Sequence, residues 1–222
     1  MCSNAHWSQQ HPQPDQEQAD LGITITRDLK WQKQTEKSCK TVNRLLGFIA
    51  QNFNYKSTKL KLPLYKSLVR SHLEYAVQFW SPHLRRDIDK MERVQRRATN
   101  MIPEIRNHSY QQRLKDLKLI GLVQRRLRGQ LNQVFKYLNR FNNVSPVGHF
   151  DYGFKDRTRN NGKKIIVKRF NTSVAQHFFP INITTTWNDL PHDVVNSATV
   201  NTFNNHLDAH WEDNPPEVLV NW

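Results

Sequence analysis

Apolar residues recur every three or four positions through the middle of the chain, which is the spacing of one face of an α-helix. This pattern predicts helices over most of residues 35–141 and a last helix over 197–211. The clearest case is the helix expected over 86–102. Its apolar face carries Ile88, Met91, Val94, Gln95, Ala98, Met101 and Ile102. Pro103 ends this helix, because proline has no N–H to continue the hydrogen-bond ladder.

Four further helices follow from the same spacing. One covers 38–53, and one over 62–82 opens near Pro63 and ends at Pro82. A third opens at Ser109 with Gln112 three residues on, a capping-box pattern, and is broken by Gly121. The fourth covers 122–141, with an expected buried stripe of Val123, Leu127, Leu131, Val134, Leu138 and Phe141.

Alternation of apolar and polar residues appears only at the start of the chain. Leu21, Ile23 and Ile25 predict a short strand that ends in a turn at Arg27–Asp28. The Gln-rich segment 1–20 is nearly free of aliphatic residues and is expected to be disordered. Beyond a polar stretch after residue 142, "IIVKRF" at 165–170 predicts a strand, and a helix is expected near 184–188.

The expected fold is therefore mainly α. It has a disordered segment at 1–20, a strand and turn at 21–34, a helical domain at 35–141, and a loop with a small mixed α/β tail at 142–222.

A second face of the 86–102 helix carries only cations. Arg86, Lys90, Arg93 and Arg97 follow one another at i, i+4, i+7 and i+11, and we call these four residues the basic stripe. Four aligned cations with no acid among them predict contacts to phosphate, although a merely solvated face is the alternative. Arg125 and Arg128 are expected to form a second row. The nearby aromatic residues Tyr110, Phe135 and Tyr137 either pack inside or stack on bases.

The overall charge supports a polyanionic partner. The chain has 33 Lys and Arg against 19 Asp and Glu, a net charge of +14, and a pI of about 10.0. Between Leu84 and Arg128 there are 13 basic residues and 5 acidic ones. Nucleic acid is the usual partner of such a surface, and an anionic membrane is a less common one.

No catalytic or metal-binding constellation is recognisable. The sequence has no Gly-x-Gly and no adjacent Asp pair, and its two cysteines, Cys2 and Cys39, are far apart. His206 and His210 could share a metal on one helix face, but no third ligand is evident. No catalytic residue and no metal ligand is therefore expected. No membrane-spanning run or signal peptide is found, so an intracellular protein of the nucleus or cytoplasm is expected, without a membrane partner.

A longer series of motifs resembles a known family. The matching residues are Leu64, Tyr65, Leu68, Val69, Leu73, Glu74, Tyr75, then Phe79, Trp80, Ser81, Pro82, then Met91, Glu92, Val94, Gln95, Arg96, Arg97 and Ala98. Together with "DLGITIT" before them and "WNDLP" and "FNNHLDAHW" after them, they resemble the region downstream of the polymerase core in reverse transcriptases of LINE-type (non-LTR) retrotransposons of the jockey-related group. The similarity extends over residues 20–222.

This resemblance implies a helical thumb that follows a strand of the palm and grips the backbone of a template–primer duplex. The parent family is an RNA-directed DNA polymerase that holds Mg²⁺ on palm aspartates, and no Asp-Asp pair exists here. The resemblance therefore implies a truncated fragment without its own catalysis or cofactor. Its expected partners are RNA or an RNA–DNA duplex and the missing palm and fingers. The alternative is a small basic protein-interaction module derived from the element.

Overall fold

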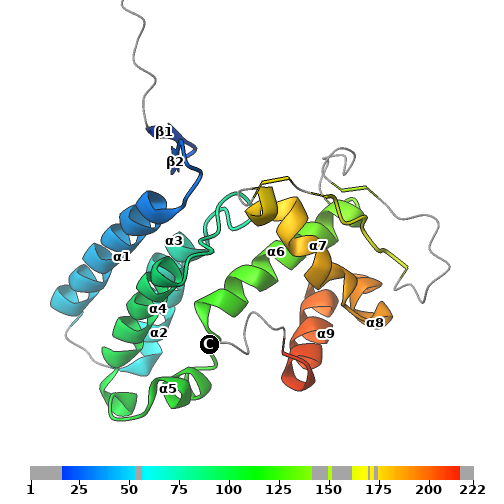
Figure 1. The fold of residues 1–222 in the computed structure, drawn as a ribbon. Coiled ribbons are helices and arrows are strands. Elements are labelled where there is room, and N and C mark those ends of the chain that lie inside the picture. The colour runs from blue at the N-terminus through cyan, green and yellow to red at the C-terminus, as the bar shows by residue number, and fades with distance from the viewer. Residues whose placement is uncertain are drawn as a thin grey trace, which may run out of the picture.

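The computed structural model describes residues 17–53, 57–141, 150–151, 162–169, 171–172 and 175–215. Within these ranges the chain is mainly helical, as the apolar spacing predicted, and has one two-stranded antiparallel sheet. Figure 1 shows the sheet at one end of α1, and α6 running between the first helices and the tail. The disorder expected for the first sixteen positions lies outside the described residues.

The hairpin at the start corrects the expectation for residues 17–20. β1 (Glu17–Asp20) pairs antiparallel with β2 (Ile23–Thr26), the strand that the alternation predicted. The two loop residues, Leu21 and Gly22, have φ angles of 45° and 82°. Positive φ at both positions suits the twist of a two-residue hairpin. The polar side chains of β1 are exposed while its backbone pairs, so polarity alone wrongly indicated disorder here.

The predicted helix over 86–102 is confirmed as α4 (Arg85–Asn100), which packs against α1 (Gln32–Asn52). A short turn, η2 (Pro103–Ile105), follows α4. The buried residues of the two helices share one core. They include Val42, Leu46 and Ile49 from α1, and Met91, Val94 and Ala98 from α4. The apolar face predicted for α4 is thus the face that it buries.

The helix predicted from residue 62 starts earlier and changes its pitch. α2 (Thr58–Leu64) begins after Ser57, whose hydroxyl accepts a hydrogen bond from the backbone N–H of Lys59 at 3.2 Å. Pro63 therefore lies inside the helix. Because proline cannot donate to the preceding turn, a wider helical turn is a common response. The next segment, η1 (Tyr65–Arg70), has that π-helical form.

The same helix also ends before the predicted Pro82. α3 (Ser71–Glu74) gives way to a turn in which Ala76 has a φ of 50°. Arg126 supplies the reason, because its guanidinium donates to the backbone carbonyls of Leu73 and Trp80. These hydrogen bonds satisfy the end of α3 from a distant part of the chain, which local spacing cannot reveal.

α6 (Leu122–Leu138) joins two hydrophobic cores. It follows α5 (Tyr110–Asp116), whose first turn is capped by the Ser109 hydroxyl accepting from the Gln112 N–H at 3.3 Å, as predicted. Leu122 belongs to the core of α1 and α4, whereas Leu131 and Val134 belong to a second core with the tail. Both cores therefore include residues of α6.

The buried face of α6 differs from the predicted stripe. Leu131, Val134 and Leu138 are buried as expected, but Phe141 is 52% exposed. Two polar residues of the helix, Arg126 and Gln130, are buried instead.

The described part of the tail is helical, which corrects the predicted mixed α/β form. It contains η3 (Ala175–His177), α7 (Phe179–Asn188), α8 (His192–Val195) and α9 (Val200–Asp213). No strand forms among residues 162–169. There the Asn188 amide bonds both the N–H and the carbonyl of Ile165, at 2.9 and 2.8 Å. The next N–H, that of Ile166, donates to the Asp151 carbonyl at 2.8 Å, so the pairing in this segment is a single β-bridge at Ile165 and not a strand.

Among the residues that the structure describes, none of the helices combines the length and apolar character needed to cross a bilayer.

Candidate nucleic-acid interface

The basic stripe lies beside the line of contact between α4 and α1. Three contacts from the stripe reach α1: Arg86 to Gln32, Lys90 to Glu36, and Arg97 to Asn43. Each contact joins residues 54 positions apart, so the two helices run parallel in a constant register. Packing against α1 therefore keeps the four cations in one line.

The stripe faces solvent for most of its length. Arg86, Arg93 and Arg97 are exposed, and the Lys90 side chain is 31% exposed. The buried face of the helix, with Met91 and Val94 in the core, lies about a third of a turn away from the stripe. An extended anion can therefore reach the cations without any change in packing.

Acidic residues approach one half of the stripe. Lys90 Nζ lies 2.8 Å from Glu36 Oε1 and 3.7 Å from Asp87 Oδ1, and Arg86 Nε lies 3.7 Å from the same Asp87 oxygen. The hydrogen bond from Lys90 holds the pKa of Glu36 below its usual value. Asp87 belongs to α4 itself, whereas Glu36 comes from α1 and could not be found by inspecting α4 alone.

The other half of the stripe has no acidic partner among the described residues. Arg93 donates from Nε to the backbone carbonyl of Asp89 at 3.2 Å. Arg97 donates from Nη1 to Asn43 Oδ1 at 3.1 Å. Both guanidinium groups thus keep their full charge and most of their donors available to an anion.

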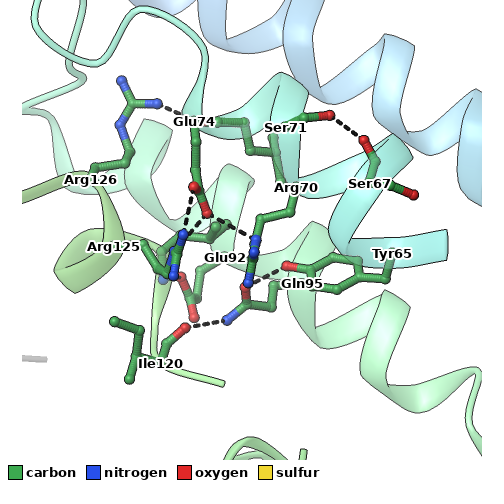
Figure 2. A network of polar contacts seen from close by, with 12 residues as sticks. Tyr65, Ser67, Arg70, Ser71, Glu74, Glu92, Gln95, Ile120, Arg125 and Arg126 are labelled. Atoms are coloured by element: carbon green, nitrogen blue, oxygen red, sulfur yellow. Dashed lines mark hydrogen bonds and ion pairs between the residues drawn. The ribbon is translucent and has the colours of Figure 1, made fainter. Parts of the chain in front are cut away.

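The predicted second row is engaged in ion pairs. Arg125 donates from Nε and Nη2 to the two carboxylate oxygens of Glu74, at 2.8 and 2.9 Å, and Arg70 lies 3.2 Å from the same carboxylate. Figure 2 shows Glu74 between these two arginines. Arg128 pairs with Asp208 at 2.9 Å, which links α6 to α9. Arg125 and Arg128 hold helices together, and they are less available to phosphate than Arg93 and Arg97.

A buried polar network fixes the inner side of α4. Gln95 accepts a hydrogen bond from the Tyr65 hydroxyl at 2.5 Å and donates to the Ile120 carbonyl at 3.1 Å, as Figure 2 shows. Glu92 accepts from the Tyr110 hydroxyl and from the Leu122 N–H. Burial raises the pKa of Glu92 above its usual value. Since buried polar groups must be paired, this network determines the rotation of α4 about its axis.

The neighbouring aromatic residues are occupied by packing. Phe135 is fully buried, and Tyr137 packs against Phe150 with ring centroids 6.1 Å apart. Tyr110 lies under the guanidinium of Arg96, 4.7 Å from its ring centroid, and its hydroxyl belongs to the network above. Of the two alternatives left open by the sequence, packing is thus the confirmed one for Phe135.

Two features were missed by the sequence reasoning. Arg126 is buried without an acidic partner among the described residues, with its guanidinium 4.3 Å from the centroid of the Trp80 ring. Nothing in the local sequence distinguishes it from its neighbours Arg125 and Arg128. The second feature is a row of cations on α1. Its members are Lys33, Lys37, Lys40 and Arg44, and their helical spacing is visible in the sequence.

Comparison with models of protein families, with curated proteins and with solved structures finds no match to this chain.

Proposed function

We propose that this chain binds the phosphodiester backbone of nucleic acid through the basic stripe, without reading base sequence. The observation that carries the proposal is the stripe itself: four cations held in line by the parallel packing of α4 on α1, about a third of a turn from the buried face of α4. Sequence-independent binding needs cations that meet phosphates and no donors aimed at bases.

The length of the stripe fits such a contact. An α-helix rises ~1.5 Å per residue, so Arg86 and Arg97 are ~16 Å apart along the axis. A few successive phosphates of one strand extend over a similar distance. The net charge of +14 gives the chain a long-range attraction for polyanions of any sequence.

The motif series from Leu64 to Ala98 supports a more specific proposal about origin. We propose that the chain corresponds to the thumb and following region of a LINE-type reverse transcriptase, acting on RNA or an RNA–DNA duplex. In that role it would position nucleic acid for a palm that carries the Mg²⁺-binding aspartates, and would not itself extend a primer. Primer extension by the purified chain with Mg²⁺, primed template and nucleotides would contradict this role.

Binding to an RNA–DNA duplex over a series of salt concentrations tests the proposed function. Four phosphate contacts predict a slope of log affinity against log salt of roughly −3 to −4, with micromolar or weaker affinity at physiological salt. Duplexes of unrelated sequence should bind equally. A slope near zero, or a strong preference for one sequence, would exclude backbone binding by the stripe.

A second candidate function rests on an apolar groove of about 750 Å³ beside the β-hairpin. Leu21, Tyr75, Phe79 and Phe178 line it and are all exposed. Exposed apolar surface of this kind is typical of a protein-binding site, which favours an interaction module as the alternative. Substituting Phe79 by Ser would abolish that function and leave duplex binding unchanged. A loss of duplex binding in this variant, with the helical signal intact, would place the interface at the groove instead.

A further inference from the structure

α1 carries a second row of cations that matches the basic stripe in spacing. Lys33, Lys37, Lys40 and Arg44 follow one another at i, i+4, i+7 and i+11, and we call them the α1 row. All four are exposed. At 100° per residue they lie on the side of α1 opposite its buried residues Val42 and Leu46. The α1 row is therefore a solvent face of the same helix that packs against α4.

The parallel register brings corresponding parts of the two rows together. Asn43 meets Arg97, and the same register of 54 residues places Cys39 level with Arg93. Lys40 and Arg44 directly follow those two α1 residues in sequence. The C-terminal parts of both rows thus lie at the same level of the helix pair, and packed helix axes are typically ~8–10 Å apart.

The two rows differ along their length in their contacts with acidic residues. In the first half, Lys33 pairs with Glu17 of β1 and Lys90 pairs with Glu36. Lys37 donates to the Gly22 carbonyl at 3.3 Å, so the hairpin also covers this end. A phosphate that approached these cations would have to displace carboxylates or hydrogen bonds that already exist.

The C-terminal members of the two rows have fewer such contacts. These members are Lys40, Arg44, Arg93 and Arg97, and we call them the open quartet. Within the described part of the chain, the hydrogen bond of Arg44 is to the Thr41 hydroxyl of its own helix, at 3.5 Å. None of the four forms an ion pair with a carboxylate in the described part of the chain. Four charges without an ion pair in the described residues therefore stand together, beside the middle of α1 and the C-terminal half of α4.

We infer that nucleic acid binds across both helices at the open quartet, with Lys40 and Arg44 as phosphate-binding residues, and not along α4 alone. This inference rests on the proposed backbone binding. Residues four apart on a helix rise ~6 Å, so the quartet spans ~6 Å along the axes and ~8–10 Å across them. Two or three phosphates of one backbone cover such a patch, and no existing ion pair has to break.

Two matched variants of α1 test the inference in the full chain. Lys40→Gln/Arg44→Gln removes two charges from the open quartet, and Lys33→Gln/Lys37→Gln removes two charges from the acid-paired half of the same helix. Each lost phosphate contact flattens the salt slope for duplex binding by ~0.9. The quartet variant should therefore flatten the slope by about 1.5–2, and its loss of affinity between 50 and 200 mM salt should shrink about tenfold relative to wild type.

The control variant should change the slope by less than about half a unit, with an unchanged helical signal in both. Equal changes in the two α1 variants would overturn the inference, because net charge alone would then explain them. An unchanged slope in the quartet variant, beside a clear loss in Arg93→Gln/Arg97→Gln, would also overturn it while leaving the proposed function in place. Absence of duplex binding by the wild-type chain would overturn both.

Discussion

Lys90 of α4 and Glu36 of α1 meet with 2.8 Å between Nζ and Oε1, across two helices whose contacts keep a register of 54 residues. This ion pair lies at the boundary between the acid-paired and the acid-free parts of the interface. Under the proposed function, Glu36 would compete with phosphate for Lys90, and its negative charge would repel a nucleic-acid backbone that approaches the two helices. Glu36 and Asp87 would therefore lower the affinity of the first half of the stripe.

Replacing Glu36 by Gln should strengthen duplex binding. The change frees Lys90 and removes a repulsive charge, so affinity at low salt should rise about two- to fivefold, in keeping with the modest strength of exposed ion pairs. The salt slope should become steeper by up to ~0.9, since one more phosphate contact is gained. Asp213→Asn, which removes an exposed acid at the end of α9, is the matched control. Equal effects of the two variants would mean that only net charge matters.

Arg126 should be the most important single residue for the turn after α3. Its guanidinium donates to the buried carbonyls of Leu73 and Trp80, and burial lowers its pKa to about 9, so it stays charged at neutral pH. Arg126→Met leaves both carbonyls without a partner. Charge-assisted hydrogen bonds contribute ~1.5–3 kcal/mol each, so the free energy of unfolding should fall by about 3 kcal/mol or more.

Urea denaturation of Arg126→Met measures this loss. Lys136→Met on the same helix is the control, because Lys136 is only partly buried. The control should change the free energy of unfolding by less than about 0.5 kcal/mol. A similar small change in Arg126→Met would show that these carbonyls do not depend on Arg126.

Glu92 should give the stability a recognisable pH dependence. Burial raises its pKa in the folded chain above the ordinary value of 4.5, so the folded state binds the proton more readily than the unfolded state. Its contribution is then fully present below pH 4.5 and is lost as the pH rises through the folded pKa. Because Glu92→Gln cannot ionise, the stability of this variant relative to wild type should increase from pH 4 to pH 7.

The thermal midpoint of both proteins across this range measures the difference. Glu104→Gln should behave in the opposite way, because hydrogen bonds from its own backbone N–H and from Thr58 lower the pKa of Glu104. Its carboxylate contributes stability above pH 4.5 that is lost as the pH falls. A Glu92→Gln difference that stays constant or falls with rising pH would rule out the burial of an unfavourable charge at this site.

Parts of the fold that depend on local spacing were predictable from the sequence. The apolar face of α4 was identified by its recurrence at helical intervals, and its residues Met91, Val94 and Ala98 are buried. Ser109 was identified as a cap by its distance from Gln112. In each case the determining partners lie within a few turns of the same helix.

Parts that depend on distant partners were not predictable. The end of α3 is set by Arg126, and the backbone of Ile165 is taken up by Asn188, in both cases from another element. Contacts between helices in the interface were likewise not predictable from local spacing. The cations of α4 could be aligned from their spacing, but only the packing of α1 revealed Glu36 beside Lys90. The α1 row has the same spacing as the basic stripe, so the alignment of its cations is also visible in the sequence.

The salt dependence of duplex binding by wild type and by Arg93→Gln/Arg97→Gln tests the central claim most directly. Both residues are exposed and have no acidic partner among the described residues, so the variant should keep its helical signal. We expect the slope of log affinity against log salt to change from roughly −3 to −4 in wild type to roughly −1 to −2 in the variant. The same slope and affinity in both proteins would contradict the claim and leave the basic stripe as a solvated face.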